Sequence, residues 1–407
     1  SASHGLSEFG TAGVVTGVNV IQCFPTNNFQ KSYLEGYESI SGEHLKEAGY
    51  VKRHAACASC GIGCHIYTEV DSGTYAGSYS GGPEYETLAA FGGGCGITDP
   101  EALIRINEVC NMLGLDTISA GSVVQWVMET FERGLLSESD LDGIGPRWGD
   151  VHAVLKIISM IAERRGFGDV LARGVAHAAE VVGGDSWKWA IEVKGLEQSR
   201  IETRVRKGVA LAFAVNPRGP DHLYGWCVAE SARTPEARIL IGKICGDEKY
   251  ANPKLLEKRA DIVKWHEDVF AAAECMGICI YTCILGYALG PEEMAQMYNL
   301  ATGSNLSEDE LMLVGSRIVN LERCINVRRG ASRADDRLPW RLMNEPMGEG
   351  PHEGMINSEQ ELNQMLDEYY ALRSWNLATG IPEAKGLRRL GLGKIADELE
   401  SLRGRSQ

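Results

Sequence analysis

Apolar residues recur at helical spacing along most of the chain after residue 98. In the segment TDPEALIRINEVCNMLGLD they repeat every three or four positions, with Thr98 or Asp99 as the helix cap and Gly114 as the stop. Alternating, strand-like runs are short and rare, so the pattern predicts a mainly α protein. Three later segments have the helical spacing and also end in glycine: residues 119–134, 150–168 and 169–184.

The helical pattern breaks once, between about residues 185 and 200, where DSWKWAIEVKGLEQ has the character of a short β stretch. We therefore predict two domains, residues 1–190 and 191–407. The second is predicted to contain a helix in NLSEDELMLVGSRIVNLERCINVRRG, then the Pro- and Gly-rich loop LPWRLMNEPMGEGPHEGM, then two more helices.

Composition narrows the class of protein. A chain of 407 residues with 44% hydrophobic content can bury two cores, and its net charge of -15 disfavours nucleic acid or an anionic membrane as a partner. No apolar run approaches the ~20 residues of a membrane-spanning helix. The 12 cysteines are irregularly spaced, which indicates reduced thiols and a cytoplasmic protein. The chain opens without an initiator Met or an apolar leader, so we expect a processed chain or a fragment.

The stretch CASCGIGC places Cys57, Cys60 and Cys64 at C-x2-C-x3-C spacing. Three thiolates complete neither a zinc tetrahedron nor a cubane cluster, so a fourth ligand is required. Zinc sites usually show two ligand pairs, whereas a triplet with one remote cysteine is typical of a [4Fe–4S] cluster. The spacing favours iron–sulfur but leaves zinc and unligated thiols open. The candidate fourth ligands are His54, His65, Cys95, Cys275, Cys279 and Cys283.

Two hexapeptides echo each other. NMLGLD at 111–116 and ECMGIC at 274–279 share a polar first residue and a glycine in fourth place, each at the end of an amphipathic helix. A helix that ends in glycine exposes backbone groups beside the polar side chain, and this arrangement can hydrogen-bond the edge of a heterocycle. By themselves, such hexapeptides are more often ordinary helix ends.

Longer phrases of the chain include EFGTAGVV, FPTNNFQ, GPEYETLAAFGGGCGI, GLDTISAGSVVQWVMETFERGLL, NPRGPDHL, ECMGIC and NLERCINVRRGASRADDRLP. In these phrases and in the cysteine triplet, the chain as a whole resembles the two C-terminal helical domains of the aldehyde ferredoxin oxidoreductase family, whose members hold tungsten, or sometimes molybdenum, between two pterin dithiolenes. The resemblance implies two multihelical domains that share a cofactor and a [4Fe–4S] site at their interface. Family members begin with a β-rich domain that nothing here resembles, so we expect it to be absent from this chain.

The resemblance also implies the cofactor ligands. Cys279, which ends the second hexapeptide, would be the fourth ligand of a [4Fe–4S] cluster with Cys57, Cys60 and Cys64. The hexapeptides would each bind one pterin. The family usually has Asp at both first positions, whereas Asn here loses the charge and Glu extends it by one methylene. The expected pterin-binding residues are Asn111, Gly114 and Asp116 in the first domain, and Glu274 and Gly277 in the second.

For the chemistry, Glu86 matches the family's active-site glutamate, with Tyr85 before it, and His222 matches a histidine that would hydrogen-bond the substrate oxygen. A carboxylate beside an apolar cavity has a raised pKa, which suits a general acid or base. Without the resemblance, Glu86 is one of 55 acidic residues and more often a solvated side chain. Arg218 and Asp221 flank His222 and either position it or pair with each other.

The sequence therefore predicts an oxidoreductase that converts an aldehyde to a carboxylic acid at a tungsten- or molybdenum-bis-pterin centre. Electrons would pass through the [4Fe–4S] cluster to ferredoxin or another electron-transfer protein, and a homo-oligomer is compatible with the sequence. One alternative is a family relative that reduces an aromatic acyl-CoA in a larger complex. Others are a non-catalytic iron–sulfur or zinc module and a truncated apo fragment.

Overall fold

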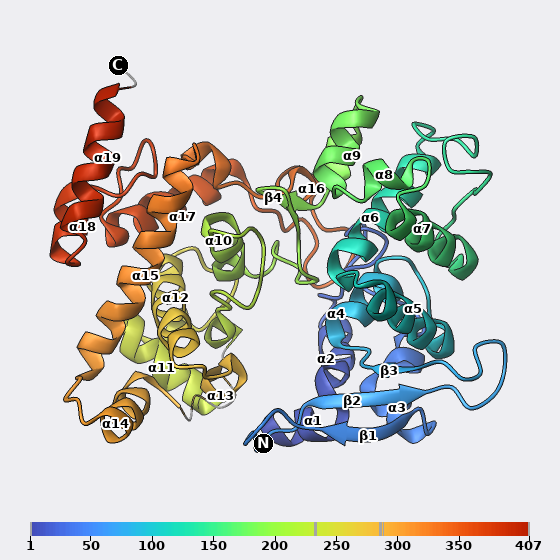
Figure 1. Ribbon diagram of the computed structural model, residues 1–407, viewed down its shortest axis with the longest axis horizontal. Coiled ribbons are helices and arrows are strands. Elements are labelled where there is room, and N and C mark those ends of the chain that lie inside the picture. The colour runs from blue at the N-terminus through green and yellow to red at the C-terminus, as the bar shows by residue number, and fades with distance from the viewer. Residues whose placement is uncertain (1, 232–233, 285–286, 288, 406–407) are drawn as a thin grey trace. The chain divides into compact units, whose positions relative to one another are not determined.

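The protein is described here by a computed structural model that covers residues 2–231, 234–284, 287 and 289–405 (Figure 1). It is mainly α, as predicted, and divides into two compact units. Unit 1 comprises Ser1–Val205 and Pro339–Ile356, and unit 2 comprises Arg206–Leu338 and Asn357–Gln407. The predicted boundary near residue 190 and this division differ for residues 191–205 and 339–356.

Unit 1 is built from helices around one core, with two small sheets. Its longest helices, α5, α6 and α7, pack against one another, and Gly121 of α6 lies so close to Ala90 that a Cβ atom there would come within 2.6 Å of the Ala90 side chain. Its helices are α1 Ala2–Phe9, α2 Val14–Val20, α3 Gly42–Glu47, α4 Tyr85–Thr87, α5 Pro100–Leu113, α6 Thr117–Glu132, α7 Val151–Glu163, α8 Gly168–Leu171, α9 Val175–Val182 and α16 Trp340–Asn344, with 3-10 turns Gly10–Gly13, Tyr37–Ile40 and Ser186–Trp189 and a π-helix Leu88–Gly93.

The strands of unit 1 form two antiparallel sheets. A three-stranded sheet has the order β1 (Val51–Ala55), β2 (His65–Glu69), β3 (Tyr79–Gly81), and the cysteine triplet lies in the loop between β1 and β2. Sequence analysis did not identify this sheet. The short hairpin of β4 (Glu192–Val193) and β5 (Leu196–Glu197) confirms the predicted β stretch.

The regular elements described for unit 2 are helices, joined by loops. The long helix α12 packs against α10, α15 and α17, and Figure 1 shows α15 and α17 in orange beside the yellow α12. The helices are α10 Lys207–Val215, α11 Pro235–Cys245, α12 Arg259–Cys275, α13 Ile280–Ile284, α14 Pro291–Thr302, α15 Glu308–Arg328, α17 Glu359–Arg373, α18 Ala384–Arg389 and α19 Gly393–Arg405, with 3-10 turns Val228–Ser231, Glu248–Tyr250 and Arg333–Asp335.

Several predicted helix ends are confirmed and two predictions are wrong. The Asp99 side chain caps α5 by accepting from the backbone N–H groups of Glu101 and Ala102, and Gly114 ends the helix with φ +67°. The predicted helix over 169–184 is two helices, α8 and α9, because Gly174 adopts φ +90° between them. The predicted loop over 338–355 contains the short helix α16, and it is followed by three helices rather than two.

The returning segment Pro339–Ile356 is held in unit 1 by a buried ion pair. Nη1 and Nη2 of Arg341 donate to the two carboxylate oxygens of Glu129 at 2.8 and 2.5 Å, and both side chains are almost fully buried. Arg341 also donates to the carbonyl of Asn28 at 2.7 Å. A bidentate pair between residues so far apart in sequence explains why this segment joins unit 1.

A loop with left-handed backbone lies beside this ion pair. Asn27, Asn28 and Phe29 have φ of +46°, +53° and +63°, and an aromatic residue in this region is unusual. Arg204 donates to the Phe29 carbonyl at 2.9 Å, and the guanidinium of Arg200 lies 5.2 Å from the centre of the Phe29 ring. Buried arginines therefore hold the strained conformation.

None of the described helices is long and apolar enough to cross a membrane.

Candidate functional site

The cysteine triplet occupies the β1–β2 loop with its thiols accessible. Cys57 is exposed, and Cys60 and Cys64 are half-buried. The backbone N–H of Ile62 donates to the sulfur of Cys60 at 3.4 Å. Backbone N–H groups of Gly63 and Ile62 lower the pKa of Cys60 below its usual value. A loop whose amides point at sulfur stabilises thiolates, and a thiolate is the form that binds a metal or a cluster.

The nearby alternatives for the fourth ligand fit less well. Cys95 lies in the core with no exposed surface, and burial raises its pKa strongly. His65 is 3.3 Å from the carboxylate of Glu84 through Nδ1. Among the described side chains, no group of three or more His, Cys, Asp or Glu residues forms a ready metal site. The predicted cluster ligands divide between the units, with Cys279 exposed in unit 2 and the triplet in unit 1.

Hydrogen bonds connect His65, the residue after the triplet loop, with the segment that carries Glu86. His65 directly follows Cys64 and contacts Glu84. The hydroxyl of Thr11 donates to the other oxygen of Glu84 and accepts from the backbone N–H of Tyr85 at 2.7 Å. Glu84, Tyr85 and Glu86 are consecutive, so one short segment carries both the partner of His65 and the predicted catalytic carboxylate.

Glu86 and Tyr85 both hold the main chain of Arg200. The Arg200 backbone N–H donates to Oε2 of Glu86 at 2.8 Å, and the Tyr85 hydroxyl donates to the Arg200 carbonyl at 3.0 Å. Glu86 lies in the short helix α4, directly before the π-helix Leu88–Gly93. π-Helical turns are rare and frequently lie at functional sites. Tyr85 is buried and Glu86 is half-buried.

The first hexapeptide forms a Schellman helix end. The N–H of Gly114 donates to the carbonyl of Asn111 at 3.3 Å, and the N–H of Leu115 donates to that of Cys110 at 2.9 Å. The Asn111 amide donates to the Ser80 hydroxyl at 2.7 Å and to the Gly81 carbonyl at 3.2 Å.

The end of the first hexapeptide lies close to Glu86. Asp116 caps α6 by accepting from the N–H of Ser119 at 2.7 Å. The hydroxyl groups of Thr87 and Thr117, the neighbours of Glu86 and Asp116, are 2.9 Å apart. Unit 1 thus brings the predicted pterin-binding residue Asp116 close to the predicted catalytic residue Glu86.

The second hexapeptide has the same backbone geometry in unit 2. The N–H of Gly277 donates to the carbonyl of Glu274 at 3.0 Å, and the N–H of Ile278 donates to that of Ala273 at 2.9 Å. Gly277 has φ +69°, close to the +67° of Gly114, and Glu274 is exposed as Asn111 is. The two hexapeptides that resemble each other in sequence therefore also share a backbone conformation. Each unit presents an exposed polar side chain at a helix end that is terminated by glycine.

The His222 segment lies near Glu322, a residue that sequence analysis missed. Arg218 and Asp221 form an ion pair with an N–O distance of 2.5 Å. Of the two roles considered for them, positioning His222 or pairing with each other, the structure shows the pairing. The ring of His222 lies edge-on to Trp226, with their centres 5.4 Å apart.

Glu322 of α15 accepts from the Tyr224 hydroxyl. Burial raises its pKa; the Tyr224 hydrogen bond and the charge of Arg218 oppose this rise, and the charge of Glu274 adds to it. Glu322 thus lies among residues of the His222 segment and the second hexapeptide. It comes from a regular helical pattern that gives no local sign of a site.

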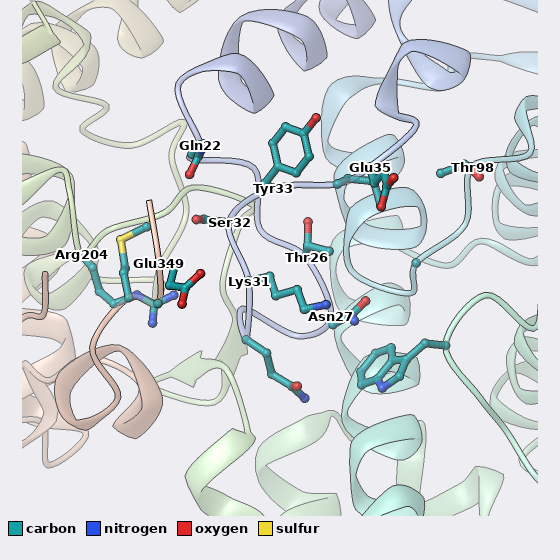
Figure 2. Close-up of a pocket in the computed structure, with 16 residues that line it drawn as sticks. Gln22, Thr26, Asn27, Lys31, Ser32, Tyr33, Glu35, Thr98, Arg204 and Glu349 are labelled. Atoms are coloured by element: carbon teal, nitrogen blue, oxygen red, sulfur yellow. The ribbon is translucent and has the colours of Figure 1, made fainter. Parts of the chain in front are cut away.

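Unit 1 also contains a polar pocket of about 560 Å³ (Figure 2). It is formed by the strained loop, the following segment to Glu35, Trp148 and the loop around Glu349. Figure 2 shows Thr26, Lys31, Ser32 and Glu349 around it. None of the predicted site residues is among the side chains that line this pocket.

Comparison with known proteins identifies relatives over nearly the whole chain. The family described as aldehyde ferredoxin oxidoreductase, domains 2 & 3, matches residues 1–392. Tungsten-containing aldehyde ferredoxin oxidoreductase from Thermococcus kodakarensis is 33% identical over 397 residues, which are 97% of this chain and 61% of the relative. The protein of the same name from Pyrococcus furiosus is 34% identical over 398 residues, with the same two shares of 97% and 61%.

A more distant relative is the aliphatic sulfonate oxidoreductase, WOR-like subunit, of Pyrococcus furiosus, which is 27% identical over 94% of this chain and 57% of its own. Among solved structures, the active site complex BamBC of benzoyl coenzyme A reductase, in complex with 1,5 dienoyl-CoA, superimposes with a TM-score of 0.74 at 21% identity, covering 94% of this chain and 59% of that chain. At this identity the likeness shows a shared fold. The chain spans about three fifths of the length of these relatives.

Proposed function

The chain belongs to the aldehyde ferredoxin oxidoreductase family, and from this premise we propose that its protein oxidises an aldehyde to a carboxylic acid at a tungsten- or molybdenum-bis-pterin centre. The observation that carries the proposal is the matched pair of helix ends at Gly114 and Gly277. Two ligands of one kind, such as two pterins, call for two sites of one geometry. A single pterin or a lone cluster gives no reason for the repetition.

The residues present fit such a group. Asn111 and Asp116 offer an amide and a carboxylate in unit 1, and Glu274 offers a carboxylate in unit 2. Pterin edges carry both donors and acceptors, so amide and carboxylate side chains are suitable partners. Gly114 and Gly277 leave the space beside them open, since a Cβ atom at either position would contact nothing within 4 Å. When bound, the metal–pterin group supplies the two-electron redox step.

Cys57, Cys60, Cys64 and Cys279 would hold a [4Fe–4S] cluster that passes the electrons to ferredoxin. Cys57 and Cys279 are exposed and Cys60 and Cys64 are half-buried, whereas Cys95 and Cys110 are buried. The lowered pKa of Cys60 favours the thiolate that iron requires. Because the chain spans three fifths of its relatives, the activity is proposed for the full-length protein.

Glu86 is the proposed acid or base. Its carboxylate would hold the proton released when an aldehyde hydrate becomes an acid, and the Arg200 N–H fixes the direction of that carboxylate. His222 would orient the substrate oxygen through a ring nitrogen. The Arg218–Asp221 ion pair lies in the same loop as the ring.

The test is aldehyde-dependent reduction of benzyl viologen by full-length protein purified without oxygen. Wild type is expected to turn over aldehydes, and Glu86→Gln is expected to lower kcat by about 10²- to 10⁴-fold, the usual contribution of a general base. Glu180→Gln, at a carboxylate 84% exposed on α9, is the matched control and is expected to keep full activity. Full activity of Glu86→Gln, or no aldehyde turnover by wild type, would refute the proposal.

A second candidate is the reduction of an aromatic acyl thioester. The observation that favours it is the departure from Asp at Asn111 and Glu274, which changes the hydrogen bonds offered to the pterins. The same preparation assayed with benzoyl-CoA and a low-potential reductant separates the two. Turnover of the thioester without turnover of aldehydes would establish the second candidate in place of the first.

A further inference from the structure

We propose that Arg200 is a positioning residue for Glu86, a role that rests on the proposed function of Glu86. Two neighbouring side chains of α4 hold both backbone groups of Arg200: Glu86 accepts from its N–H at 2.8 Å, and Tyr85 donates to its carbonyl at 3.0 Å. The carboxylate of Glu86 is therefore directed by a peptide group, and its aim depends on how firmly that peptide is held.

The guanidinium of Arg200 is the anchor of that peptide. It has no exposed surface, and it donates to the side-chain oxygen of Gln125 at 3.1 Å and to the hydroxyl of Ser122, both on α6. The Ser122 hydroxyl gives its own proton to the Ile118 carbonyl at 2.7 Å, which leaves its lone pairs for Arg200. The planar fork of arginine suits two acceptors one helical turn apart.

The residues of α6 that bind the Arg200 guanidinium also contact the π-helix that follows Glu86. The amide of Gln125 donates to the Ala90 carbonyl at 2.6 Å, and Ala90 lies in the π-helix that directly follows α4. Glu86 is thus joined to α6 along two routes, one through its own helix and one through the backbone and side chain of Arg200. Movement of Arg200 would move the carboxylate relative to α6, whose cap is Asp116.

The buried charge of Arg200 is only partly compensated, by the hydrogen bonds to α6 and by the Phe29 ring, whose centre lies 5.2 Å from the guanidinium. No carboxylate of the described chain lies within ion-pair distance of Arg200, and its Nε–H has no hydrogen-bond partner. Burying a charge costs free energy unless the charge is paired and hydrogen-bonded. Burial lowers the pKa of Arg200, and the more distant charges of Glu86, Glu197 and Asp116 oppose this. Two of these three acids are residues of the proposed site.

The test is a double-mutant cycle in the full-length holoenzyme, with iron and tungsten or molybdenum content measured for each variant. Arg200→Met keeps the length of the side chain and loses the fork. We expect kcat to fall about 10- to 100-fold, the scale of a small misplacement of a catalytic group, with KM changed less than about twofold. In the Glu86→Gln background the same substitution is expected to change kcat less than about twofold, because no carboxylate remains to be positioned.

Two further measurements separate positioning from folding and from the proposed function. Ser122→Ala removes one acceptor and leaves Arg200 in place, and it should lower kcat in the same direction. Hydrogen exchange of amides 198–205 needs no turnover: it should be faster in Arg200→Met and in Glu86→Gln, and no faster in the double variant than in Arg200→Met. Arg133→Met, which alters a half-exposed arginine of the same unit, should change neither kcat nor this exchange.

Additive effects on kcat, or exchange that is unchanged by Arg200→Met, would overturn the positioning role. If wild type turns over no aldehyde, the proposed function fails, and the exchange cycle alone then decides the role of Arg200. Non-additive exchange would support the contact with Glu86, and additive exchange would overturn it.

Discussion

Replacing Arg341 by Met is predicted to release the returning segment Pro339–Ile356 from unit 1. The substitution removes both donors to Glu129, the donor to the Asn28 carbonyl at 2.7 Å, and a 2.7 Å contact from Nε to Glu345. Burial raises the pKa of Glu129, but the hydrogen bonds and charge of Arg341, with Asn28 and Arg133, outweigh it and keep the pKa lowered. Without Arg341, the fully buried carboxylate of Glu129 would lose most of the hydrogen bonds and the positive charge that offset the cost of its burial.

The size of the effect follows from this burial. Removing one partner of a buried ion pair costs about 3–5 kcal/mol, because the other charge is left in the interior. If the loss of this free energy makes local opening of α16 easier by the same amount, the rate of amide hydrogen exchange in α16 rises roughly 10²- to 4 × 10³-fold. Arg133 binds the same carboxylate at 2.9 Å, but it is 44% exposed, so we expect its loss to cost less than about 1 kcal/mol.

The assay is hydrogen exchange of the Glu345 amide, which donates to the Arg341 carbonyl at 2.8 Å at the end of α16. Arg341→Met and Arg133→Met are compared with wild type at the same pH and temperature. Equal acceleration in the two variants, or less than a tenfold effect of Arg341→Met, would refute the reasoning that burial sets the strength of this pair.

Two predictions concern the cysteines in the metal-free protein and in the holoenzyme. Because backbone N–H groups lower the pKa of Cys60, and burial raises that of Cys110 to about 12, iodoacetamide should label Cys60 at lower pH and much faster than Cys110; mass spectrometry of the digested protein checks this. Equal labelling would contradict it. Cys57→Ser should abolish bound iron in the full-length protein, whereas Cys324→Ser, at a buried thiol of unit 2, should retain it; iron retained by both variants would remove Cys57 from the cluster.

Local signals in the sequence predict local structure well in this chain. Asp99 and Gly114 mark the ends of α5 because a cap and a left-handed glycine act within one helical turn. Gly174 was misjudged because the apolar spacing continues on both sides of it, and only its φ of +90° separates α8 from α9. The sheet β1–β3 escaped notice because its strands are short and β1 is largely exposed.

Features that depend on distant partners could not be predicted. Arg341 and Glu129 are 212 positions apart in the sequence, so nothing local assigns the returning segment to unit 1. The same is true of Arg200 and Glu322, which lie next to predicted site residues only after folding. The hexapeptide echo was detectable because each copy is local, and the matched helix ends at Gly114 and Gly277 are its structural counterpart.

The most direct test of the central claim is elemental analysis of the full-length protein, purified without oxygen from its source organism, for iron, tungsten, molybdenum and zinc. The account predicts about four irons, as a [4Fe–4S] cluster requires, with one tungsten or molybdenum per chain. Zinc in place of iron, or iron with neither heavy metal, would contradict the cofactor site proposed at the two helix ends.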